Sequence, residues 1–183
     1  GVEVQSETVW RQADKYLVPR ICFINKMDRV GADFHRTVAM IEERLNTKAL
    51  IIQLPLGVEK EFQGVIDLIE NSAWMFPCDI NSKPVKLTVP EEYKQDVAEY
   101  REAMIENLAE IDDQLAVRYL EGDVIAASEL KVALRKATLA NKLTPVLCGS
   151  ALRNKGVQPV LDAVVDYLPS PLDTPPVRGT DPK

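Results

Sequence analysis

Hydrophobic positions near the start of the chain predict a surface-packed helix followed by a buried strand. Ser6 is a suitable N-cap residue, and Pro19 ends the segment that follows it. Between them, three apolar residues recur at helical spacing (Val9, Ala13, Leu17). Residues 21–24 then form a short, continuously apolar run. Such a run is typical of a strand that is buried on both faces of a parallel sheet.

The next segment repeats this alternation of strand and helix. A loop over residues 25–31 leads to a helix that Asp33 caps, and its apolar stripe has spacings of four, three and four (Phe34, Val38, Ile41, Leu45). Residues 49–56 predict another strand, which ends around Pro55 and Gly57. The order strand, loop, helix and strand indicates an α/β domain.

The middle of the chain has a different pattern. Residues 62–69, 73–76 and 85–89 predict short strands separated by polar turns, and therefore a small antiparallel sheet. One long helix follows, which Gly122 ends, with its apolar residues on one side (Tyr93, Val97, Tyr100, Met104, Leu108, Ile111, Leu115). Ser128 is placed to cap a further helix through about Ala140. Strands followed by helices indicate an α+β insertion.

The α/β alternation returns at the end of the chain. Residues 144–148 predict a strand and residues 149–156 a loop. A helix follows, with a core stripe at Val157, Val160, Leu161, Val164 and Leu168. Four prolines then predict an extended tail (Pro169, Pro171, Pro175, Pro176).

Composition places the chain among ordinary globular proteins. Apolar residues make up 46% and charged residues 27% of the 183 positions. No apolar run is long enough to cross a bilayer, and the first residues lack the basic and apolar regions of a signal peptide. Three widely spaced cysteines (Cys22, Cys78, Cys148) in apolar stretches favour reduced, buried thiols and a cytoplasmic location. The single histidine, His35, is expected at a solvent-facing position of its helix.

The net charge of −6 argues against direct nucleic-acid binding, which needs a basic face. The acidic residues are concentrated between positions 91 and 113, where nine carboxylates face two basic residues. That segment carries −7, so the rest of the chain is close to neutral. A charge run of this kind is either a solvated helix face or a docking surface for a basic partner.

The motif Asn25-Lys26-Met27-Asp28 directly follows the first predicted strand, at the end where ligands bind in open α/β sheets. A carboxylate such as Asp28 can accept both N1–H and the exocyclic amine of guanine. Adenine lacks both donors, and sites of this kind discriminate by roughly 10⁴–10⁵. The Asn25 amide can hold the purine edge and neighbouring loops, the Lys26 stem can cover the base, and Met27 is expected to pack inward. A polar loop that merely caps the next helix is the alternative.

A second motif, Gly149-Ser150-Ala151-Leu152, follows the last predicted strand. The main-chain N–H of Ala151 can donate to guanine O6, where adenine has an amine instead. Ser150 can brace the Asp28 carboxylate, and Gly149 permits a close approach of the chain. A Ser-Ala pair alone means little, but at the end of the next core strand it completes a guanine site.

These stretches together resemble bacterial-type elongation factor G, over essentially the whole chain. The resemblance rests on residues 5–13, 23–33 and 148–171, and in the middle on Gly64-Val65-Ile66-Asp67-Leu68 and Tyr119-Leu120-Glu121-Gly122. In that family Asn-Lys-Met-Asp and Ser-Ala-Leu are the fourth and fifth GTPase motifs. The resemblance implies an α/β fold with the later strands and helices of a P-loop-GTPase-type parallel sheet and an inserted α+β subdomain.

This likeness also implies a division of the chain. Residues 1–57 and 143–170 are expected to belong to the G domain, residues 58–142 to the insertion, and residues 171–183 to a linker. The longer protein of which this chain would be a part would hydrolyse GTP to drive translocation on the ribosome. A release-factor or ribosomal-protection GTPase is a related alternative, and a module that only binds a ribosomal protein is an alternative of another class.

The parts that handle phosphate are not found in these 183 residues. A Gly-rich loop ending in Lys-Ser/Thr is needed, yet no glycine here precedes a lysine. Two stretches resemble motifs that bind phosphate or Mg²⁺ but are not assigned to them. In Asp28-Arg29-Val30-Gly31 the Asp is expected to read the base, and Asp173-Thr174-Pro175-Pro176 lies in the tail. The family's first three motifs and its Mg²⁺ site would precede Gly1. The chain is therefore expected to be a catalytically inactive fragment that holds GTP or GDP weakly or not at all.

Two partner surfaces are expected. The family's insertion contacts the ribosomal stalk protein, which would meet the outward carboxylates of the acidic helix (Asp96, Glu99, Glu102, Glu106, Glu110). The strand at residues 21–24 would lack one neighbour, and an open apolar edge invites strand pairing. Either a contact between copies or a rearranged N-terminus is therefore expected to cover that edge. No membrane partner is expected.

Overall fold

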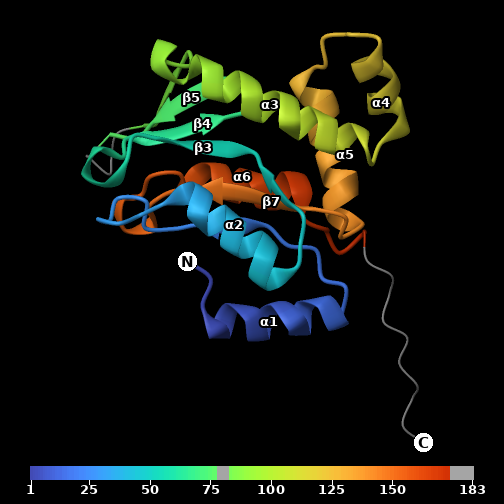
Figure 1. Cartoon of the computed structure of the whole chain (residues 1–183), viewed down its shortest axis with the longest axis horizontal. Coiled ribbons are helices and arrows are strands. Elements are labelled where there is room, and N and C mark those ends of the chain that lie inside the picture. The colour runs from blue at the N-terminus through green and yellow to red at the C-terminus, as the bar shows by residue number, and fades with distance from the viewer. Residues whose placement is uncertain (78–82, 174–183) are drawn as a thin grey trace, which may run out of the picture.

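A computed structural model describes residues 1–77 and 83–173 and has two sheets (Figure 1). The first is parallel, with the order β1-β7-β2, and β7 (Thr144–Cys148) lies between β1 (Cys22–Ile24) and β2 (Ala49–Ile51). All five residues of β7 are buried. The second is antiparallel, with the order β3-β4-β5-β6. The expected α/β class with an antiparallel α+β part is confirmed.

The antiparallel sheet has four strands, β3 (Gln53–Leu56), β4 (Gly64–Asp67), β5 (Ser72–Met75) and β6 (Val85–Leu87). Three helices accompany it: α3 (Lys94–Ala109), α4 (Asp113–Leu120) and α5 (Ala127–Leu139). In Figure 1, α3 runs across this sheet on the side away from the parallel sheet, and α4 lies beyond its end. Short 3₁₀ turns, η1 (Glu59–Glu61) and η2 (Glu91–Tyr93), flank the sheet.

Helix α2 (Phe34–Leu45) forms as its apolar stripe predicts. Its four buried residues are the predicted ones (Phe34, Val38, Ile41, Leu45), and Asp33 Oδ1 caps it by accepting from the N–H of Arg36 at 2.9 Å. His35, next to the buried Phe34, is exposed but stacks on Tyr100 of α3, with 5.5 Å between ring centroids. This contact links the helix after β1 to the acidic helix.

The segment 49–56 is two strands, and its prediction as one was wrong. Ile52 separates β2 from β3 and bonds to both sheets: its N–H donates to Val146 at 3.2 Å, and its carbonyl accepts from Leu68 at 3.0 Å. The run of apolar residues is continuous because both strands are covered, β2 by neighbours in the parallel sheet and β3 by neighbours in the antiparallel sheet. The antiparallel sheet therefore starts at Gln53, upstream of the expected boundary at residues 57 and 58.

The long helix of the middle region is also divided. Helix α3 ends at Ala109, and Asp112 caps α4 by accepting from the N–H groups of Gln114 and Leu115. The apolar periodicity runs through the break because both helices cover the same core. Ser128 is not the cap of α5: the cap position is Ala126, whose N–H donates to Glu129 Oε2 at 2.9 Å.

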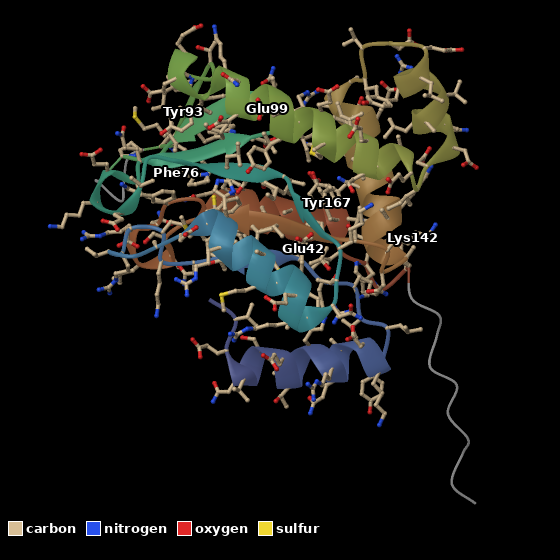
Figure 2. All side chains as sticks on the ribbon, viewed as in Figure 1. Glu42, Phe76, Tyr93, Glu99, Lys142 and Tyr167 are labelled. Carbon is tan, nitrogen blue, oxygen red and sulfur yellow. The ribbon has the colours of Figure 1, made fainter. Side chains whose placement is uncertain are left out.

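Two helices do not bury the faces that their apolar residues predicted. Helix α1 (Val4–Lys15) starts before Ser6 and buries none of its residues; Val9 is 65% exposed. In α6 (Val157–Tyr167) the buried residues are Ala163 and Tyr167, whereas Leu161 is 61% exposed. Tyr167 lies in the middle of the molecule (Figure 2). The small side chain of Ala163 and the flat ring of Tyr167 allow α6 to pack closely against α5.

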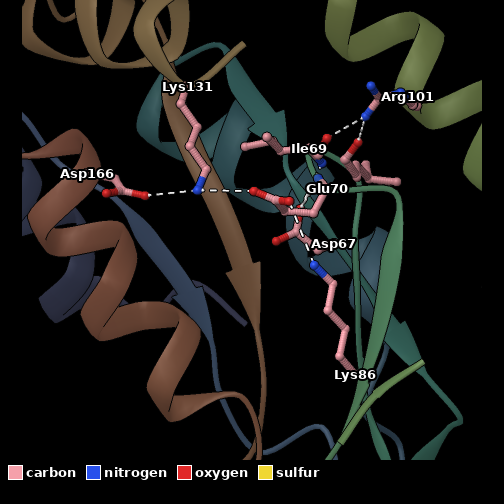
Figure 3. A network of polar contacts seen from close by, with 8 residues as sticks. Asp67, Ile69, Glu70, Lys86, Arg101, Lys131 and Asp166 are labelled. Atoms are coloured by element: carbon pink, nitrogen blue, oxygen red, sulfur yellow. Dashed lines mark hydrogen bonds and ion pairs between the residues drawn. The ribbon is translucent and has the colours of Figure 1, made fainter. Parts of the chain in front are cut away.

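An ionic network joins the antiparallel sheet to α5 and α6 (Figure 3). Lys131 of α5 lies between Glu70 at 3.2 Å and Asp166 of α6 at 3.5 Å, and Lys86 of β6 is 3.8 Å from Glu70. Arg101 of α3 donates to two main-chain carbonyls of the turn after β4. Lys131 thereby links the turn after β4 to α6.

The thiols of Cys22 and Cys148 are free and at least half-buried, and burial raises the pKa of Cys22 to about 11. Cys78, residues 174–183 and the Asp-Thr-Pro-Pro stretch beyond Asp173 lie outside the described residues. Among the helices of residues 1–77 and 83–173, none is long and apolar enough to cross a membrane.

Candidate functional site

The two predicted motifs lie side by side at the carboxyl ends of β1 and β7. These strands are parallel neighbours in register, with Ile24 opposite Cys148. Beyond them the pairing continues through the loops: the N–H of Gly149 donates to Ile24 at 3.0 Å, and the N–H of Met27 donates to Gly149 at 3.1 Å. Main-chain bonds therefore hold together two loops that are more than 120 residues apart in sequence.

Asn25 joins the loops with its side chain. Its Oδ1 accepts from the N–H of Lys26 at 2.8 Å and from the N–H of Ala151 at 3.0 Å. The second bond matches the expectation that Asn25 holds neighbouring loops. The same bond occupies the Ala151 N–H, which was expected to face guanine O6. When a base binds, Asn25 would therefore have to share this N–H with the base or release it.

Asp28 lies at the centre of the site as a carboxylate with its side chain 15% exposed. The Ser150 hydroxyl is the largest influence that holds the pKa of Asp28 below its usual value, and Arg29 and Arg153 act in the same direction. The fully buried Ser150 hydroxyl approaches without making a complete hydrogen bond to any described residue. Asp28 is therefore ionised at neutral pH, as a bidentate acceptor must be.

The remaining motif residues divide into one buried and three exposed side chains. Met27 is 3% exposed and packs in the core. Lys26 is exposed and its backbone is left-handed (φ +67°), an uncommon conformation for a residue with a side chain. Ala151 and Leu152 are also exposed, the latter 77%, at the start of the 3₁₀ turn η3 (Ala151–Arg153).

The second loop is closed by a pair of main-chain bonds between Ser150 and Lys155, at 2.8 and 3.0 Å. Gly149 is required at its base because a Cβ there would lie 2.4 Å from the carbonyl oxygen of Lys155 and 2.7 Å from the ring of Phe23. The close approach anticipated for this glycine is present.

Three residues near the site were not predicted. Arg153 Nε lies 3.7 Å from Asp28 Oδ2, Glu59 Oε1 accepts from the N–H of Gly31 at 2.7 Å, and Lys155 Nζ donates to Phe62 at 2.7 Å. Lys155 lies within the stretch that resembles elongation factor G, but nothing in its spacing indicated a partner. Glu59 carries no sequence signal at all.

The free side of β1 borders a groove of about 580 Å³. The first residues of the chain line it together with β1 and the loop that follows, and Val2 is buried there. Part of this strand edge is therefore covered by the N-terminal residues.

The five predicted docking carboxylates are all exposed on α3 or at its end (Asp96, Glu99, Glu102, Glu106, Glu110). Glu99 lies on the outer surface of the helix (Figure 2). Glu106 accepts from the Tyr119 hydroxyl at 2.7 Å, and Glu110 pairs with Lys48 at 2.6 Å. The buried face consists of Val97, Met104 and Leu108.

Comparison with known proteins identifies similar sequences and structures. The family described as the elongation factor Tu GTP binding domain matches residues 1–170. The crystal structure of ttk003000868 from Thermus thermophilus is similar over 94% of this chain, with a TM-score of 0.82 and 30% identity. This chain covers 26% of that one, about a quarter of its length.

Proposed function

The chain belongs to the elongation factor Tu GTP binding domain family of translational GTPases, and from this premise we propose that its two loops recognise guanine. The observation that carries the proposal is the cross-linking of the loops by Met27, Gly149, Asn25 and Ala151. It brings an ionised Asp28 and the Ala151 N–H to one edge of the sheet.

In this proposal Asp28 accepts from N1–H and the exocyclic amine of guanine, and Ala151 donates to O6. The exposed Lys26 stem covers one face of the base. Arg153 has to leave Asp28 when the base arrives, which is inexpensive because its side chain is 69% exposed. Met27 contributes by anchoring the loop in the core.

For the whole protein, we propose an elongation-factor-G-type GTPase that hydrolyses GTP during translocation on the ribosome, in the cytoplasm. Residues 1–57 and 143–170 form its G-domain part, residues 58–142 the insertion, and residues 171–183 a linker. A release-factor or ribosomal-protection relative would share these features, and residues that precede Gly1 in the gene would distinguish them.

The experiment for guanine recognition is Asp28→Asn in the full-length gene product. An amide in place of the carboxylate loses one acceptor, so preference for guanine over adenine nucleotides should fall by at least tenfold, of roughly 10⁴–10⁵ available. Titration with labelled GDP and ADP measures the preference. Asp33→Asn, which alters only the cap of α2, is the control. An unchanged preference in Asp28→Asn contradicts the proposal.

By itself this chain should not turn over GTP, because base contacts leave the reacting phosphates and the Mg²⁺ unheld. Its affinity for GDP should be millimolar or weaker, about −4 kcal/mol. A phosphate-release assay on the pure chain with Mg²⁺ tests this, and reproducible turnover would overturn it.

A second function is proposed for the acidic helix α3, supported by the exposure of all five carboxylates. We assign it as a docking face for a basic partner, of which the ribosomal stalk protein is the candidate. If no basic partner binds this face, the acidic helix is only a solvated surface. Pairing with a second copy is also proposed for the part of the β1 edge that the N-terminal residues leave uncovered, and sedimentation analysis of the isolated chain would detect it.

A further inference from the structure

A short turn between two strands of the antiparallel sheet, β3 and β4, contacts both proposed guanine loops, which are residues 25–31 and 149–156. Residues 57–62 run from the end of β3 through η1, and main-chain bonds fix their shape: Glu61 donates to Val58 at 2.9 Å and Phe62 donates to Glu59 at 3.1 Å. Gly57 has φ +85°, and a Cβ there would lie 2.1 Å from the carbonyl oxygen of Glu61. The turn therefore has one defined conformation.

The first contact reaches the loop that follows β1. Glu59 Oε1 accepts from the N–H of Gly31 at 2.7 Å, three residues after Asp28. A carboxylate that accepts a main-chain N–H makes a charge-assisted bond, stronger than one between neutral groups. Glu59 makes it from a left-handed backbone (φ +49°), which is costly for a residue with a side chain.

The second contact reaches the loop that follows β7. Lys155 Nζ donates to the carbonyl of Phe62 at 2.7 Å. Phe62 is 1% exposed, so packing in the core fixes its carbonyl. Lys155 also forms the main-chain pair with Ser150 that closes this loop. The turn thus contacts each loop once, from residues three positions apart.

A third contact joins the turn to the acidic helix. The N–H of Gly57 donates to the Tyr93 hydroxyl at 3.1 Å, and Tyr93 ends η2, directly before α3. The acidic helix is therefore connected to both loops through six residues of the chain.

We propose that residues 57–62 act as a clamp that sets the spacing of the two guanine loops, with Glu59 and Lys155 as positioning residues. The clamp couples the guanine site to the surface of α3. This inference rests on the proposed guanine-binding function and adds its control by the insertion. Since coupling between two sites is reciprocal, a partner on α3 that shifts the turn changes guanine-nucleotide affinity, and the nucleotide changes partner affinity equally.

The main experiment compares Glu59→Ala with Glu61→Ala in the full-length protein. Both remove one carboxylate from the same turn, but the Glu61 side chain is exposed and makes no hydrogen bond or ion pair to either loop in the described part of the chain. Glu59→Ala should weaken binding of labelled GDP by about threefold to thirtyfold, the usual range for residues that couple sites. Glu61→Ala should leave it unchanged. Glu59→Gln, whose amide oxygen can still accept from Gly31, should lie between them.

Lys155→Met removes the other contact and keeps an unbranched side chain that is one atom shorter. It should weaken GDP binding by a similar factor, and Tyr93→Phe, which removes only a hydroxyl, by a smaller one. Amide hydrogen exchange of this chain without nucleotide provides a direct readout: Glu59→Ala should accelerate exchange at Gly31, whereas Glu61→Ala should not.

The outcomes separate the clamp from the function on which it rests. If Asp28→Asn relaxes guanine preference while Glu59→Ala and Lys155→Met bind GDP normally, the clamp is wrong and guanine recognition stands. If Asp28→Asn has no effect, guanine recognition is wrong, and only the exchange rate at Gly31 still reports on the clamp. Should Glu59→Ala fail to fold, Glu59→Gln and Lys155→Met decide the matter by the same measurement.

Discussion

The guanine loops and the acidic face of α3 are built in opposite ways. In the loops the main chain makes the decisive contacts, and Asp28 is largely sheltered behind Ser150 and Arg153. On the acidic face of α3 the carboxylates are exposed, and their ion pairs, such as that of Glu110 with Lys48, are surface pairs. Surface pairs contribute about 0–1 kcal/mol each. A single added methyl group in the loops should therefore change stability and guanine affinity. On the helix face, partner binding should change only when several charges are altered at once.

The largest effect on stability should come from Gly149→Ala. The added methyl group collides with the Lys155 carbonyl and the Phe23 ring, so stability should fall by about 1–3 kcal/mol, together with guanine affinity. Urea denaturation measures the loss. Gly122→Ala is the matched control, because Gly122 has φ +76° but no atom within 4 Å of its Cβ position, and it should cost only backbone strain, about 1 kcal/mol. Equal losses in the two variants would show that the loop is not tightly packed.

An intermediate effect is expected at the cap between α3 and α4. Asp112 accepts from two N–H groups and pairs with Lys136 at 3.0 Å, so Asp112→Ala should cost about 1 kcal/mol. Asp113→Ala, one position further along, should cost less because its side chain caps nothing in the described structure.

The cap also predicts a pH dependence. The hydrogen bond from Lys136 is the main cause that lowers the pKa of Asp112 in the folded state. A lowered pKa means that the stabilisation is fully present above the unfolded-state value of about 3.9 and is lost as pH falls through the folded-state pKa. The difference in stability between the unmodified chain and Asp112→Ala should therefore shrink below about pH 4. A difference that persists in acid would contradict the role of the carboxylate.

The smallest effect on stability per site should come from reversing Glu99, Glu102 and Glu106 to lysine: within about 0.5 kcal/mol at Glu99 and Glu102, and more at Glu106, which loses the hydrogen bond from Tyr119. Association with a basic partner such as the stalk protein should nevertheless slow by about tenfold or more at low salt and lose its salt dependence. Stopped-flow mixing at two ionic strengths measures both.

A control for this reversal has the same change in charge elsewhere, at the exposed residues Glu42, Glu43 and Asp162. If the α3 variant associates as fast as the unmodified chain at low salt, the face is only solvated. If the control slows association as much, net charge rather than the face steers the encounter.

Features whose signal lies within one element or one loop could be predicted from the amino-acid sequence alone. The stripe of α2 names its four buried residues, Asp33 names its cap, and the small antiparallel sheet follows from short apolar runs between turns. Both motifs proposed to recognise guanine could be found because their residues stand directly after apolar strands, and strands that are parallel neighbours bring their carboxyl ends together.

Which neighbour covers each apolar surface became clear only from the packing of the folded chain. Periodicity records that a residue is buried, but it does not record what buries it, so residues 49–56 were not recognised as belonging to two sheets that meet at Ile52. For the same reason Leu161 of α6 was assigned to the core in place of Tyr167. The bonds of Glu59 to Gly31 and of Lys155 to Phe62 span 28 and 93 positions. Contacts of that range arise when whole elements pack, because the distance between the two partners is set by the sheets and not by the residues between them.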